Sequence, residues 1–86
     1  MSWKVIWSER SKEDLQTLGS KEIQRVVKKV ESHLVKDPIA LGKPLTGRLA
    51  GLYRYRVGDY RIIYKARKNE LTVMVFRVGH RKDVYD

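Results

Sequence analysis

The sequence predicts an α+β domain in which two helices pack on one face of an antiparallel-rich sheet, in the order strand, helix, helix, three-stranded meander. Three observations indicate this class: an alternating apolar segment, then apolar residues at helical spacing, then β-type segments around a Gly-Asp pair. The length of 86 residues leaves room for one domain, 1–86.

The first segment, residues 3–7, alternates apolar and other side chains and predicts a short strand whose two Trp residues belong to the core. Either Ser8 or Ser11 can cap a first helix, and Gly19 is placed to end it. Ser20 can cap the second helix.

The second helix carries an apolar stripe that should face the core, since its members fall within an arc of about 100°. Asp37-Pro38 should stop this helix, because the residue before a proline avoids the helical region. The following segment, 39–51, is expected to be a loop. The stripe consists of Ile23, Val26, Val27, Val30 and Leu34.

The rest of the chain reads as β-structure. Segments 52–57 and 60–67 flank Gly58-Asp59, a two-residue turn typical of tight hairpins. A further turn at 68–70 precedes the last strand, 71–78. The two-residue turn fixes the pairing, so that Arg56 should lie directly opposite Arg61.

The hairpin register places four cations on one face of the sheet, away from the helices. Like charges on directly opposite residues destabilise a strand pair, so this arrangement makes sense if a phosphate backbone lies over that face. The alternative is a solvated outer face that is basic because the whole chain is basic. Both interpretations stay open. The four residues are Arg54, Arg56, Arg61 and Lys65.

The overall charge favours a polyanionic partner. Nineteen Lys and Arg against ten Asp and Glu give a net charge of +9, which attracts nucleic acid, an anionic membrane surface or an acidic protein. No long apolar run or signal-peptide pattern is present, so we expect a cytoplasmic protein without a membrane partner. With no Cys and two separate His, we expect no metal site and no cofactor.

The end of the chain adds an imidazole, further cations and an aromatic side chain next to the basic face. Arg77, Arg81 and Lys82 are further cations, His80 can transfer a proton, and Tyr85 can stack on a base. An ordinary surface histidine and a C-terminal packing tyrosine are the alternatives. His33 borders the apolar stripe and is expected to pack or face solvent.

Four segments together resemble a known family: Leu-Gly-Lys-Pro-Leu at 41–45, Gly-Leu-Tyr-Arg at 51–54, Gly-Asp-Tyr-Arg-Ile-Ile-Tyr at 58–64 and Gly-His-Arg-Lys-Asp-Val-Tyr at 79–85. The chain is similar over nearly its whole length to RelE-type toxins of the RelE/ParE superfamily. This resemblance implies a ribosome-dependent, metal-independent endoribonuclease that cuts messenger RNA in the ribosomal A site by attack of the ribose 2′-hydroxyl.

The resemblance also implies roles for individual residues. Arg61 and Arg81 would stabilise the charge that develops on the phosphate, and Tyr85 would orient a base. His80 is the preferred proton-transfer group, because Arg rarely loses its proton. The remaining cations would bind RNA: Arg54, Arg56, Lys65, Arg77 and Lys82.

The implied partners are a RelB-like antitoxin, messenger RNA and the 70S ribosome, with operator DNA bound only by the toxin–antitoxin complex. Two other functions stay open. One is a ParE-like inhibitor of DNA gyrase that shares the fold and cuts no RNA. The other is an inactive binding module, since some relatives carry Lys at the positions of Arg54 and Arg56.

Overall fold

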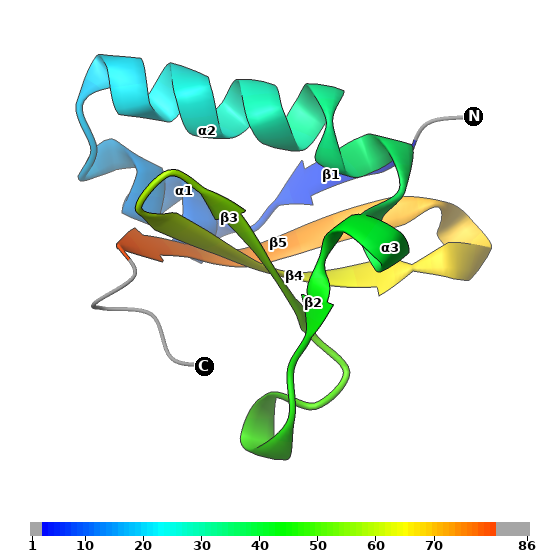
Figure 1. The fold of residues 1–86 in the computed structure, drawn as a ribbon. Helices are drawn as coiled ribbons and strands as arrows, with labels where there is room; N and C mark the ends of the chain where they lie inside the picture. Colours follow the sequence, from blue (N-terminus) through cyan, green and yellow to red (C-terminus); the bar gives the residue numbers. More distant parts are fainter. Residues whose placement is uncertain (1–2, 81–86) are drawn as a thin grey trace.

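A mixed five-stranded sheet forms the centre of the fold, with the strand order β1-β5-β4-β3-β2 (Figure 1). The structure is a computed structural model and describes residues 3–80. β1 runs parallel to β5, and every other pair of neighbours is antiparallel. The strands are β1 (Lys4–Trp7), β2 (Lys43–Pro44), β3 (Tyr53–Val57), β4 (Tyr60–Arg67) and β5 (Thr72–His80).

Two main helices, α1 (Glu9–Gln16) and α2 (Ser20–Ser32), lie on one face of this sheet (Figure 1). This arrangement confirms the predicted α+β class. A four-residue helix, α3 (Pro38–Leu41), lies near β2, and no described helix is long and apolar enough to cross a membrane. Three single 3₁₀ turns complete the described secondary structure: η1 (Leu34–Lys36), η2 (Gly47–Leu49) and η3 (Lys68–Glu70).

Ser8 is the residue that caps α1. Its hydroxyl accepts a hydrogen bond of 3.0 Å from the backbone N–H of Ser11, which satisfies a free donor of the first helical turn. Ser11 lies inside the helix and is buried. The predicted end at Gly19 is wrong, because α1 stops at Gln16 and Gly19 instead precedes α2 as its N-cap. Ser20 is therefore the first residue of α2 and not its cap.

The apolar stripe of α2 faces the sheet as predicted. Val26 and Val30 are fully buried, while the stripe continues into η1 through Leu34, since α2 itself ends at Ser32. The core lies between this stripe and the helix-facing side of the sheet. Its buried members are Val26, Val30, Leu34, Tyr55, Val57, Ile62, Tyr64, Val73, Val75 and Val78.

The prediction of a loop over 39–51 is wrong where α3, β2 and η2 interrupt it. Asp37 caps α3 through a 3.1 Å bond from the backbone N–H of Ala40, with Pro38 at the first helical position, where a proline costs no hydrogen bond. β2 then adds a short edge strand beside β3. The buried Tyr64 hydroxyl donates to the Pro38 carbonyl at 2.6 Å, which ties this segment to the sheet.

The edge of β5 beyond the end of β1 is covered by α1 and its cap. Ser8 donates its backbone N–H to the carbonyl of Val75, and its hydroxyl donates to the carbonyl of Phe76. Further along, the Asp14 carboxylate accepts the backbone N–H of Val78 at 2.9 Å. Side chains of α1 therefore take the place of a neighbouring strand and protect an edge that would otherwise be open for pairing.

Candidate functional site

The β3–β4 hairpin has the register that the sequence predicts. Arg56 pairs with Arg61, and Arg54 pairs with Ile63. Because side chains alternate along a strand, the buried residues Tyr55 and Ile62 point to the helices while the arginines point to the other face. We call this second face, with Arg54, Arg56, Arg61 and Lys65, the basic sheet face.

The basic sheet face combines half-buried and exposed cations. Arg56 and Lys65 are exposed, whereas Arg54 and Arg61 are half-buried. Ile63 lies on the same face between Arg61 and Lys65 and is only 4% exposed, which gives the arginine stems apolar surface to pack on. Arg56 and Arg61 carry like charges on directly paired positions, which suits this face to binding a polyanion.

The end of β5 completes one side of this face. Gly79 pairs with Arg61, so β5 places no side chain opposite that arginine. His80 lies one residue further along and pairs with Tyr60. The two rings are in edge contact, with centroids 5.8 Å apart at 82°. The imidazole therefore packs on the Tyr60 phenol on the helix-facing side of the sheet. The expectation that His80 lies with the arginines on the basic sheet face is wrong, because pairing with Tyr60 turns its side chain to the other face.

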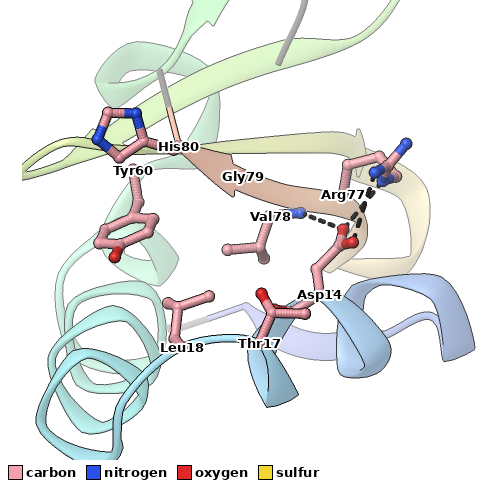
Figure 2. A pocket seen from close by; sticks show the side chains of 8 residues that line it. All are labelled: Asp14, Thr17, Leu18, Tyr60, Arg77, Val78, Gly79 and His80. Carbon is pink, nitrogen blue, oxygen red and sulfur yellow. Dashed lines mark hydrogen bonds and ion pairs between the residues drawn. The ribbon is translucent and has the colours of Figure 1, made fainter. Parts of the chain in front are cut away.

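A small pocket lies next to His80, between the end of α1 and the end of β5 (Figure 2). Its volume is about 310 Å³. Asp14 forms one wall, and His80 and Tyr60 lie together at the other end of the pocket. The residues that line it are Asp14, Thr17, Leu18, Tyr60, Arg77, Val78, Gly79 and His80.

Asp14 holds the strand that carries His80. Its carboxylate accepts from the Arg77 Nε at 2.9 Å and from the backbone N–H of Val78 at the same distance. A phosphate contact by Arg77 would have to compete with this ion pair. No pattern in the sequence indicates this role for Asp14, because its partners lie more than 60 residues along the chain.

Two other predicted residues have structural partners. His33 is half-buried and its Nδ1 lies 2.5 Å from the Tyr55 hydroxyl, in keeping with the expected packing role. Burial raises the pKa of the Tyr55 phenol, so the hydroxyl stays neutral beside the ring. Trp7 donates its indole N–H to Glu31 on α2 at 3.0 Å and packs with Trp3 against the core.

Three predicted site residues, Arg81, Lys82 and Tyr85, lie outside the described residues. Within residues 3–80, no three His, Asp or Glu side chains gather where they could hold a metal ion. The described part of the site therefore consists of the basic sheet face, the end of β5 and the pocket beside it.

Comparison with known proteins assigns this fold to a class. Residues 5–85 match the family model of the ParE toxin of the type II toxin–antitoxin system parDE. The chain belongs to this family, within the RelE/ParE superfamily, and is a toxin of a type II toxin–antitoxin system.

Among its relatives is Toxin RelG of Mycobacterium tuberculosis, 34% identical over 85 residues, which cover 99% of this chain and 98% of that protein. The crystal structure of the toxin–antitoxin complex RelBE2 from the same species matches with a TM-score of 0.89 and 32% identity, over 94% of this chain and 100% of that chain. The intact Escherichia coli RelBE complex has the same fold, with a TM-score of 0.75 at 24% identity, over 92% and 96% of the two chains.

Proposed function

We propose that this toxin is an endoribonuclease that cuts messenger RNA in the ribosomal A site without a metal ion. The observation that carries the proposal is the directly opposed pair Arg56 and Arg61 on the basic sheet face. The repulsion within this pair destabilises the free protein, and a phosphate bound over the pair would offset that repulsion by accepting hydrogen bonds from both guanidinium groups.

In the proposed reaction the ribose 2′-hydroxyl attacks the adjacent phosphorus, and the bond to the 5′-oxygen of the next nucleotide breaks. The products are a 2′,3′-cyclic phosphate and a 5′-hydroxyl. Arg61 stabilises the negative charge of the transition state, and Arg81 shares this role. Arg54, Arg56 and Lys65 hold the RNA backbone, with Lys82 as a further contact, and Tyr85 orients a base.

One proton must leave the 2′-hydroxyl and one must reach the departing oxygen. His80 is the proposed group for proton transfer, because an imidazole exchanges protons near neutral pH. It pairs with Tyr60 on the helix-facing side at the end of β5, so its ring would have to leave the edge contact with Tyr60 and reach the RNA around that end of the strand.

We further propose that a RelB-like antitoxin neutralises the toxin in the cytoplasm and that operator DNA is bound only by the complex of the two. The matched solved structures include several toxin–antitoxin complexes. The +9 charge favours an acidic antitoxin, with fast and salt-sensitive association.

Primer extension on messenger RNA in a reconstituted translation system tests the proposed activity, with and without ribosomes. We expect discrete cuts within codons that need ribosomes and persist in EDTA at concentrations that leave ribosomes assembled. Arg61→Ala should lower the cleavage rate by about 10²-fold or more. Arg67→Ala is the matched control, since Arg67 is an exposed arginine on the same strand, opposite Thr72.

Gyrase inhibition is the second candidate function, favoured by the match to the ParE toxin family model. Breaks in DNA together with intact messenger RNA would support it and would contradict the proposed nuclease. Folded protein that binds ribosomes but neither cuts RNA nor slows growth would indicate an inactive binding module instead.

A further inference from the structure

A second basic surface lies on α2 and the start of the following segment, away from the apolar stripe that packs on the sheet. Figure 1 shows α2 lying over the sheet. Its side chains border a shallow depression of about 470 Å³. We call it the α2 basic surface. It consists of Arg25, Lys28, Lys29, Ser32, His33 and Lys36.

Lys28 and Lys29 lie three and four residues after Arg25, so these three cations project from the same side of α2. Lys36 follows in η1 and lines the same depression. Like charges at this spacing destabilise a helix by a few tenths of a kcal/mol per pair, roughly 0.2–0.5. No ion pair within residues 3–80 relieves them. Of the two glutamates of α2, Glu22 lies in the first turn and Glu31 accepts the Trp7 indole N–H.

We propose that the α2 basic surface binds the phosphate backbone of a folded RNA, at a site separate from the basic sheet face. Four exposed cations, without acidic partners in the described part of the chain, provide the charge complementarity that such a backbone needs. The inference rests on the proposed function only in taking RNA as the polyanion.

The composition of the surface favours RNA over a protein or a membrane. Protein interfaces depend on apolar and aromatic anchors at their centre, and the residues of the α2 basic surface include no aliphatic, Trp, Tyr or Phe side chain. Membrane-bound helices insert an apolar face, whereas the apolar stripe of α2 is buried against the sheet.

The α2 basic surface and the basic sheet face approach each other at the β3–β4 turn. A Cβ atom on Gly58 would lie 2.9 Å from the Arg25 guanidinium, so that arginine lies over the turn. The hairpin below it carries Arg56 and Arg61 on the far side of the sheet. The domain measures 22 Å in its shortest dimension, so a substrate strand and a folded RNA can contact it from two sides at once.

Fluorescence anisotropy over a series of KCl concentrations tests the inference. The probe is a labelled RNA hairpin with 2′-O-methyl riboses, which cannot undergo the proposed cleavage. The test variant is Lys28→Gln/Lys29→Gln/Lys36→Gln. The control, Lys4→Gln/Lys12→Gln/Lys68→Gln, removes the same charge from exposed positions elsewhere. Circular dichroism and thermal unfolding confirm that both variants are folded.

Binding weakens as KCl rises, and the steepness of log K against log [KCl] decreases by about 0.9 for each duplex phosphate that the protein no longer neutralises. The test variant should therefore make the dependence less steep by about 2–3, and the control by less than about 1. Equal slopes for the two variants would overturn the inference. Polyglutamate serves as a second probe that represents an acidic protein. The inference would also be overturned if the test variant bound RNA as well as wild type and bound only polyglutamate more weakly, which would indicate an acidic protein partner. If wild-type protein cuts no RNA while the slopes differ as expected, the proposed nuclease fails and this inference stands.

Discussion

Arg56 and Arg61 show how a single register position can connect stability with the proposed function. The sequence predicts their pairing, because a two-residue turn leaves little freedom in the register of a hairpin and side chains alternate strictly. Other contacts of the site cannot be predicted in the same way. The contact of His80 with Tyr60 depends on how β5 lies beside β4, which no local pattern specifies.

Arg56→Gln should stabilise the free protein and weaken its binding to RNA. Removing one of two opposed like charges is expected to raise the free energy of unfolding by about 0.2–1 kcal/mol. Urea unfolding at low salt measures this gain, and it should shrink as salt screens the charges. Arg67→Gln is the matched control and should leave stability nearly unchanged, because Thr72 lies opposite it. A decrease in stability in Arg56→Gln would contradict the proposed repulsion.

Tyr64 should make the fold sensitive to alkaline pH. Burial, followed by the neighbouring Tyr53, Tyr55 and Asp37, raises the pKa of its phenol above the ordinary value of 10.0. The folded state thus holds the proton more tightly than the unfolded chain. Its contribution is complete below pH 10 and is lost as the pH rises above that value.

Urea unfolding between about pH 8 and pH 11 measures this effect. Tyr64→Phe should flatten the decline above pH 10 relative to wild type, because the variant has no phenol to titrate at this position. The variant should also be less stable at neutral pH, because the buried Pro38 carbonyl loses its donor. Parallel pH curves for the two proteins would rule out the assigned role of Tyr64.

At the scale of elements, side chains of α1 and its cap bond to the backbone of β5 where no described neighbouring strand does so. The sequence predicts the helix and two alternative caps, one of them correct, yet it does not identify Asp14 as the residue that joins α1 to β5. In the sequence, Asp14 cannot be distinguished from a solvent-exposed carboxylate of an amphipathic helix, because its partner Arg77 lies 63 residues further along the chain.

Asp14→Ala should destabilise the protein by about 1.5–3 kcal/mol, since it removes hydrogen bonds between a shielded carboxylate and two donors. It should also lower the proposed cleavage activity more than stability alone explains, because the end of β5 carries His80, the proposed proton-transfer group. Thermal unfolding and the cleavage assay measure the two effects. Glu13→Ala, at an exposed position on the same helix, should change neither. Wild-type activity in a folded Asp14→Ala protein would show that the contact of Asp14 with β5 does not contribute to the proposed activity.

The segment 39–51, which the sequence assigns to a loop, is held in place by close packing at Gly42. Gly42 lies against the Tyr64 ring, so close that a Cβ atom there would lie 1.8 Å from the phenolic oxygen. No other residue fits without moving Tyr64. A pattern of glycines and prolines cannot reveal this contact, because it depends on a tyrosine from β4.

Gly42→Ala should therefore displace the Tyr64 ring and destabilise the fold by about 1–3 kcal/mol, the usual cost of overpacking. Chemical denaturation measures this decrease. Gly19→Ser provides the contrast, since nothing lies within 4 Å of a Cβ atom there and serine is a favourable N-cap. It should leave stability unchanged or slightly higher. Equal stability of the two variants would contradict the close packing at Gly42.

At the scale of the whole molecule, the sheet joins the two ends of the described chain. β1 pairs with β5, and Trp3 and Trp7 at the two ends of the first segment pack on the core. The sequence predicts both strands but does not reveal that they are parallel neighbours, since non-local pairing leaves no periodic signal. We expect unfolding to be a single cooperative transition, because β5 is the one described strand that lies beside β1.

The two tryptophans provide a direct test of this cooperativity. Their fluorescence reports the docking of β1, and far-UV circular dichroism reports the helices and the sheet. The two signals should give the same midpoint in urea. A fluorescence change that precedes the unfolding of the helices would show that β1 detaches by itself.

The central position of β5 also has a consequence for the order of events in the cell. A ribosome makes β1 first and β5 last among the described strands, yet β5 lies between β1 and β4 in the sheet. A nascent chain that lacks residues 72–80 has no described strand beside β1 and only an unsupported edge beside Arg61. The sheet around Arg61 therefore cannot be completed before residues 72–80 have been synthesised.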